Sequence, residues 1–478
     1  MSATPLSPAG HARALLALGL PLIGGHLGQF AIGATDTLML GWYGVTDLAA
    51  GVLGHAVFFT FFVMGSGFAW AVMPMVAAAS AGADPGEDGQ GEDGQHDGAQ
   101  GDTTRIRRVT RMGLWLSVFF ALLLQPLFLS AEPILLAIGQ DPRVAALAAD
   151  YLAIAGWGLI PALAVMVLKS YLAALERTRI VFLVTALAAV VNAGTNWLLI
   201  YGNAGFPELG VRGAAIASVV LQVVSLAVLV AYAARVFPGH ALFVRLWRAD
   251  WPAFGDVLRL GWPIGLTNLA EVALFSASAI LVGLLGPVPL AAHGIVLQVA
   301  TATFMVHMGL SNAATIRAGK ALGAGDIAGL ARGGAVAIAV SFGFAALAIA
   351  VFLAMPQTLI GVFLSPDEPQ RAAILALGGV LMLYAAAFQA ADGAQVMAIG
   401  LLRGVQDTRV PMLIAAVSYW GVGITVSYVA AFPLGLGAPG VWAGLVAGLG
   451  TAAVLLLHRF WRRALPALAP APVPAAAA

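Results

Sequence analysis

The 478 residues of the chain include no cysteine. Disulfide bonds, thiolate-ligated metal sites and thiol catalysis are therefore excluded. Charge is also scarce, since Asp, Glu, Lys and Arg make up only 9% of the chain, against about 25% in an ordinary soluble domain, whereas 61% of the residues are hydrophobic. This composition excludes a soluble fold and indicates a protein whose main solvent is lipid.

Apolar runs long enough to cross a bilayer, which takes about 20 residues per helix, occur twelve times. We predict these spans at residues 12–45, 50–80, 107–131, 144–169, 178–203, 211–236, 256–286, 291–318, 327–356, 372–400, 409–432 and 440–460. With short loops they occupy nearly the whole chain. The sequence therefore predicts an all-α polytopic membrane protein without a separate catalytic or nucleic-acid-binding domain.

Basic residues are distributed unequally between the two sides of this arrangement. An even number of spans puts both termini on one side, and that side carries all of the 23 Lys and Arg residues except Arg143, Arg212 and Arg371. Because cytoplasmic loops are enriched in Lys and Arg, we expect both termini in the cytoplasm and the protein in a bacterial inner membrane. The first apolar stretch is too long for a signal peptide and predicts an anchor.

Two segments are expected to be disordered. Residues 81–104 contain seven acidic residues and no Lys or Arg, which predicts a solvated cytoplasmic loop. Residues 463–478 form an Ala/Pro-rich tail. Neither segment has the apolar periodicity of a packed helix.

The chain repeats itself at two offsets. At 242 positions the matching pairs are Leu18–Pro21 with Leu260–Pro263, Gly41 with Gly283, Gly44 with Gly286 and Leu48–Ala50 with Leu290–Ala292. At 230 positions they are Thr178–Arg179 with Thr408–Arg409 and Gly210–Val211 with Gly440–Val441. We predict an N-terminal lobe (1–236) and a C-terminal lobe (256–462), joined by a cytoplasmic linker (237–255). Each lobe has six helices, and a pseudo-two-fold axis along the membrane normal relates the two lobes. Such repeats are typical of alternating-access transporters.

Three acidic residues, Asp36, Glu271 and Asp392, lie inside predicted spans. An ionisable group at that depth is costly and indicates a functional site. No Lys or Arg is expected in the interior, because Lys169 falls at the predicted end of a span. The carboxylates must then be protonated, bind a small cation or face water, so we predict a negatively charged cavity that couples cation movement to transport and prefers organic cations to anions.

Other polar, aromatic and methionine side chains follow the same helices at helical spacing. The candidates for lining a cavity are Gln29, Asn192, Asn196, Thr267, Phe275, Ser278, Gln298, Met305, Met308, Phe388 and Gln395. The alternative for such amides and hydroxyls is interhelical hydrogen bonding, and for Asn192 and Asn196 both roles remain open. Pro21 and Pro263 occupy equivalent places in the two halves, where each predicts a hinge or a static bend.

The chain resembles the MATE family, the multidrug and toxic compound extrusion transporters, and most nearly its NorM-like branch. The segments that carry the resemblance are Ala34–Gly41, Gly210–Ala215, Gln389–Asp392, Leu401–Gly404 and Asp407–Pro411. The resemblance implies two six-helix lobes around a V-shaped central cavity, and export of cationic or amphiphilic drugs in exchange for Na⁺ or H⁺. It also implies cation and substrate binding by Glu271 and Asp392, with Na⁺ as one candidate ion there, and by Asp36 with Asn192 and Asn196 in the N-terminal lobe. We expect a monomer that is not an enzyme and needs no cofactor beyond the coupling ion.

Three other functions fit parts of the sequence. A related flippase for lipid-linked sugars would be expected to line its cavity with Arg to hold a pyrophosphate. An intramembrane aspartyl protease is suggested by Gly323–Asp326, which spells GxGD, although Asp326 lies in a predicted loop and is better explained as a helix N-cap. A passive channel would show no dependence on a cation gradient.

Deletion of residues 85–101 is expected to leave drug efflux nearly unchanged, because a solvated acidic loop contributes little packing. Efflux from cells that express the shortened chain at equal amounts tests this. A collapse of expression or of efflux would show that the loop has a function.

Overall fold

The computed structural model describes residues 6–82 and 103–468. All regular elements within these ranges are helices, and twelve of the helical segments are long and apolar enough to cross a membrane. The predicted all-α fold and the number of spans are confirmed. Most of the acidic segment 81–104 and the end of the tail, residues 469–478, lie outside the described residues.

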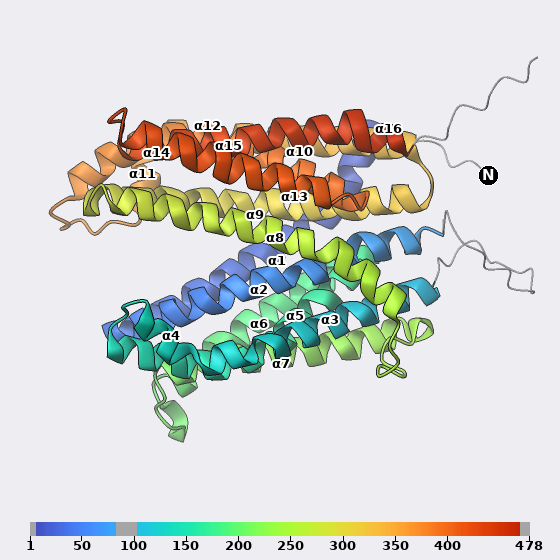
Figure 1. Ribbon diagram of the computed structural model, residues 1–478, viewed down its shortest axis with the longest axis horizontal. Coiled ribbons are helices and arrows are strands. Elements are labelled where there is room, and N and C mark those ends of the chain that lie inside the picture. Colours follow the sequence, from blue (N-terminus) through green and yellow to red (C-terminus); the bar gives the residue numbers. More distant parts are fainter. Residues whose placement is uncertain (1–5, 83–102, 469–478) are drawn as a thin grey trace, which may run out of the picture. The chain divides into compact units, whose positions relative to one another are not determined.

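Short helices separate or extend the crossings (Figure 1). The first six crossings are α1 (Pro8–Tyr43), α2 (Val45–Ser80), α3 (Thr103–Leu129), α5 (Pro142–Ala174), α6 (Thr178–Leu199) and α7 (Val211–Val236). The elements in their connections are α4 (Ala131–Ala137), η1 (Asn203–Gly205) and η2 (Pro238–His240).

The second half of the chain begins at α8. Its crossings are α8 (Trp251–Gly283), α9 (Pro287–Gly323), α10 (Ile327–Ala354), α12 (Arg371–Gly404), α13 (Arg409–Ala416) with η3 (Val417–Ile424) and α14 (Thr425–Ala431), and α15 (Ala438–Arg459) with η4 (Phe460–Ala464) and α16 (Leu465–Ala467). The short α11 (Pro356–Gly361) precedes α12. Because η4 and α16 continue the last crossing, the prediction of disorder from residue 463 was wrong for residues 463–467.

The chain forms two compact units. The N-terminal unit comprises Ala17–Ala273, and the C-terminal unit comprises Leu274–Ala478 together with Met1–Leu16. Helices α1 and α8 each run from one unit into the other, so these units and the predicted lobes, 1–236 and 256–462, have different boundaries. Hydropathy cannot show this division, because a continuous apolar helix can change its packing partners along its length.

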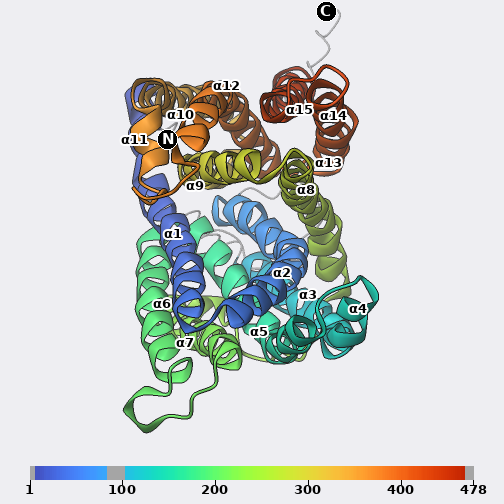
Figure 2. The same cartoon turned by 90° about the vertical axis from the view of Figure 1, so that its left-hand side faces the viewer.

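Corresponding helices make corresponding contacts in the two units (Figures 1 and 2). In the N-terminal unit α5 contacts α2, α3 and α7, and in the C-terminal unit α12 contacts α9, α10 and α15. These are the fourth and tenth crossings, which the repeat predicts to be equivalent. In an apolar stretch of 18 residues within α5, 67% of the residues are buried, which is the highest share among the twelve crossings.

Local signals in the sequence explain why α5 begins where it does and packs so closely. The Asp141 side chain caps the helix by accepting hydrogen bonds from the backbone, and Pro142 occupies the first turn, where its missing N–H costs nothing. Further along, Gly156 lies so close to the ring of Phe128 that a Cβ atom would come within 2.8 Å of it. Small residues of this kind let helices approach without a water-driven force.

The linker is attached to the N-terminal unit by arginines of α3. Arg111 donates hydrogen bonds to the carbonyl oxygens of Ala241 and Leu242, at 2.5 and 2.7 Å, and also to that of Val244. Arg108 forms an ion pair with Asp250, and its hydrogen bonds lower the pKa of that carboxyl group. The predicted linker is therefore held by specific polar contacts.

The glycines that begin the sixth and twelfth crossings correct one alignment of the repeat. Gly210 caps α7 with a φ of 54°, and Gly437 caps α15 with a φ of 61°. Such left-handed φ values favour glycine. The sequence match of Gly210 with Gly440 was therefore displaced by one turn, because a Gly-x-x-Gly pattern occurs at both sites and the second glycine was paired with the first.

The second glycine of each pattern allows two helices to touch. A Cβ atom on Gly213 would lie 2.5 Å from the carbonyl oxygen of Leu199, at the end of α6. A Cβ atom on Gly440 would lie 2.6 Å from the backbone of Ala430 in α14. Backbone atoms cannot rotate away as a side chain can, so a larger residue at either position must displace a helix.

We expect Gly213→Ala to lower the free energy of unfolding by about 1–3 kcal/mol, as is typical of overpacking. The matched control is Gly194→Ala in α6, where no atom lies within 4 Å of the added methyl group. Thermal unfolding of the purified proteins in detergent measures both variants. Equal stability of the two variants would contradict the close approach of α6 and α7.

Candidate functional site

Three predicted site residues meet in the N-terminal unit. Asp36 lies on α1, and the side-chain amides of Asn192 and Asn196, one turn apart on α6, each donate a hydrogen bond of 2.6 Å to its Oδ1 atom. Both asparagines are fully buried, and within the described residues their Oδ1 atoms have no hydrogen-bond partner. Of the two roles left open for these amides, the structure shows the interhelical one, because they join α6 to α1 through the interior acid.

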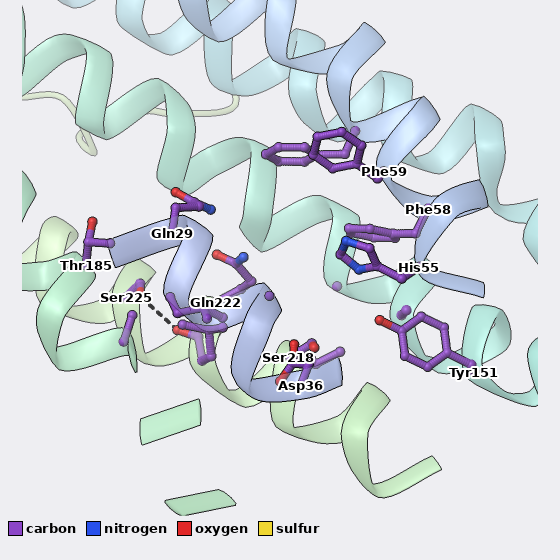
Figure 3. Close-up of a pocket in the computed structure, with 18 of the residues that line it drawn as sticks. Gln29, Asp36, His55, Phe58, Phe59, Tyr151, Thr185, Ser218, Gln222 and Ser225 are labelled. Carbon is purple, nitrogen blue, oxygen red and sulfur yellow. Dashed lines mark hydrogen bonds between the residues drawn. The ribbon is translucent and has the colours of Figure 1, made fainter. Parts of the chain in front are cut away.

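This carboxylate faces a cavity of about 160 Å³ (Figure 3). The lining comes from α1, α2, α5, α6 and α7, all within the N-terminal unit. Its polar residues include Gln29, Ser218, Gln222 and Ser225, and its aromatic residues are Phe58, Phe59, Phe62, His55 and Tyr151. Among the predicted site residues, Gln29 and Asp36 line this cavity, two turns apart on α1.

A basic residue also lines this cavity, which contradicts the prediction of an interior without Lys or Arg. Lys169 belongs to α5, and its Nζ atom donates a hydrogen bond of 2.9 Å to Oγ1 of Thr185 on α6. The helix continues to Ala174, beyond the end of the predicted span at residue 169. The long apolar stem of lysine can reach back from a helix end, and the sequence does not show in which direction it does so.

The C-terminal unit contains a second polar cluster on α12. Asp392 is fully buried, and so are Gln389 and Gln395. Gln395 donates a hydrogen bond of 2.5 Å to the Tyr419 hydroxyl group, and Gln389 donates one to the hydroxyl group of Thr303. Sequence reasoning identified Asp392 and Gln395 but missed Tyr419, because it lies in another crossing and only the tertiary fold shows that it is near.

Aromatic rings pack beside this cluster. Phe388 is only 2% exposed, and its ring centroid lies 6.0 Å from that of Phe275 and 5.8 Å from that of Trp442, with edge-to-face geometry in both cases. The indole N–H of Trp442 donates a hydrogen bond to Nδ1 of His293. Phe388, which was predicted to line a cavity, is buried among these rings in the structure.

The remaining candidates divide by exposure and by hydrogen bonding. The buried hydroxyl groups of Thr267 and Ser278 donate to backbone carbonyls of their own helix, at Pro263 and Phe275. Half-buried residues are Glu271 on α8 and Met305 and Met308 on α9, whereas Gln298 is exposed. Pro21 and Pro263 lie within α1 and α8, which continue as helices through them.

The aspartate of the GxGD sequence has a structural role. Asp326 caps α10 by accepting a hydrogen bond of 2.7 Å from the backbone N–H of Gly329. The predicted N-cap is confirmed, and this removes the observation that suggested an aspartyl protease. Within residues 6–82 and 103–468, no group of three His, Asp or Glu side chains is arranged to hold a metal ion.

Comparison with known proteins decides the family. The family model described as MatE matches residues 94–198 and 263–429. The chain belongs to the MATE family. A relative named probable multidrug resistance protein NorM, from Rhizobium meliloti, is 46% identical over 454 residues, which are 95% of this MATE chain and 93% of the relative.

Further relatives support the same assignment. The multidrug resistance protein NorM of Burkholderia vietnamiensis is 35% identical, with 96% of each chain covered. Two solved structures, a MATE protein in complex with MaL6 and a MOP superfamily transporter from Pyrococcus furiosus, match with TM-scores of 0.82 and 0.81 at 19% identity. Each match covers 96% of this chain and 97% of the solved chain, which shows that they share the fold.

Replacement of Asn192 by leucine is expected to lower efflux by at least tenfold, because it removes one donor to the Asp36 carboxylate in a buried site. In the Asp36→Asn background the same replacement should have little further effect, since both act through one carboxylate oxygen. Thr195→Val is the control on α6, because its hydroxyl group donates a hydrogen bond to the carbonyl oxygen of Val191 in its own helix. Additive losses would contradict the coupling of Asn192 to Asp36.

Proposed function

We propose that this MATE transporter exports organic cations and amphiphilic drugs in exchange for Na⁺ or H⁺ that moves inward. The names of the NorM relatives, whose sequences align over more than nine-tenths of their length, support the substrate class. The distribution of basic residues indicates that both termini lie in the cytoplasm. We propose further that the chain acts as a monomer in the bacterial inner membrane.

The observation that carries the proposal is the position of Asp36. Its Oδ1 atom is held by two buried amides while the residue lines a cavity, so its carboxylate is preorganised and still accessible to a ligand. A carboxylate with amide oxygens close by can bind a proton, a small hard cation or a substituted ammonium group. Competition among these cations for one charge makes exchange obligatory.

The second carboxylate, Asp392, lies in a closed environment. It is fully buried on α12 between Gln389 and Gln395, whose amides are engaged with neighbouring helices. A change of charge on a side chain so far from water has a large free-energy cost. Gain or loss of a cation there is therefore coupled to rearrangement of the helices that surround it, as alternating access requires.

Asp392→Asn is expected to abolish gradient-driven efflux while the amount and monodispersity of the protein stay unchanged, because the substitution removes the charge and keeps the shape. The assay is drug efflux from proteoliposomes with Na⁺ and pH gradients imposed separately, which also identifies the coupling ion. Asp367→Asn, at an exposed position before α12, is the matched control.

Undiminished efflux by Asp392→Asn would refute the role of the interior acid. Efflux that responds to neither gradient would refute antiport and indicate passive flow. Efflux lost equally in Asp367→Asn would show that the C-terminal unit tolerates no change of charge, inside or outside.

A further inference from the structure

The cavity of the N-terminal unit contains two opposite charges held apart. The carboxylate of Asp36 is bound by Asn192 and Asn196, whereas the ammonium group of Lys169 is bound by Thr185. No ion pair joins Lys169 to Asp36, both of which belong to the described residues. A cavity that only had to neutralise its acid would place the base beside it.

The separation of the two charges follows from their partners on α6. Thr185 precedes Asn192 by seven residues and Asn196 by eleven, so at 1.5 Å per residue they are about 10 and 16 Å apart along the helix axis. Figure 3 shows Thr185 and Asp36 on different sides of the cavity. The lysine and the aspartate are therefore held by partners at two levels of α6, and both line the same cavity.

Other parts of the lining are suited to an aromatic body. Phe58, Phe59 and Phe62 line the cavity from α2, and the amide of Gln29 lines it from α1, two turns before Asp36. Ring faces can stack on a flat substrate. The amide can accept or donate a hydrogen bond at the middle of such a molecule.

We propose that Lys169 is a substrate-binding residue that holds the anionic group of zwitterionic aromatic substrates, while Asp36 holds their protonated amine. The Lys169 ammonium group has three donors, of which Thr185 engages one. A zwitterion compensates both protein charges at once, whereas a monovalent cation leaves the lysine without a counter-charge in a medium of low dielectric. The proposal rests on the export function above and assigns Lys169 a role in substrate selectivity.

The test uses two dyes with the same ring system. Rhodamine 110 carries a free carboxylate and is a zwitterion near neutral pH, whereas its methyl ester, rhodamine 123, is a monovalent cation. Binding to the purified full-length protein and efflux from proteoliposomes are measured for both dyes. The proteins are the wild type, Lys169→Gln and Lys169→Arg, with Lys320→Gln, at the C-terminal end of α9, as the control lysine.

We expect Lys169→Gln to weaken rhodamine 110 binding at least tenfold and rhodamine 123 binding less than threefold. Lys169→Arg should retain the affinity for rhodamine 110, because it keeps the charge. The wild type should bind rhodamine 110 at least as tightly as the more hydrophobic ester, which tests the proposal even if Lys169→Gln does not fold.

Three outcomes would overturn this inference. Equal losses of affinity for both dyes in Lys169→Gln would show that the lysine only joins α5 to α6 by its hydrogen bond. Binding of only the ester by the wild type would refute the zwitterion site and leave cation export standing. Transport of neither dye by the wild type would refute the proposed export function as well.

Discussion

A bilayer core offers no hydrogen-bond partners, so every polar group inside it must be satisfied by the protein. This constraint accounts for the helices themselves and for the few polar side chains that they carry inward. Asp36 is held by two asparagine amides, Lys169 by a threonine hydroxyl group, and Gln395 by a tyrosine hydroxyl group. Each of these contacts joins two crossings, so the groups proposed to bind ions and substrates also hold the helices in place.

In each unit one helix contacts three equivalent crossings. In the N-terminal unit α5 has this position and carries Lys169, and in the C-terminal unit α12 has it and carries Asp392. A residue on such a helix can contact several surrounding crossings. A change of charge on such a residue therefore alters the packing energy of several crossings in the unit. Coupling of an ion to a conformational change requires an effect of this kind.

The interior of the N-terminal unit does not contain acidic groups alone. The sequence predicts three acids and no base, but the N-terminal cavity has an acid and a base at different levels. An electrostatic preference for monovalent cations would follow from the acids alone. The proposed role of Lys169 would make selectivity depend on how charges are spaced along a substrate as well as on their sum.

The sequence by itself determined the features that depend on composition and periodicity. Twelve spans, the all-α fold and the capping role of Asp326 could be derived from it, because hydropathy and local spacing encode them. The MATE resemblance rests on short sequence segments, and it was this resemblance that implied the grouping of Asp36 with Asn192 and Asn196. Only the tertiary structure decided the direction of the Lys169 side chain, the burial of Phe388 among aromatic rings, the partnership of Gln395 with Tyr419, and the equivalence of Gly210 with Gly437. These depend on which faces of distant helices meet, and no local pattern of residues specifies that.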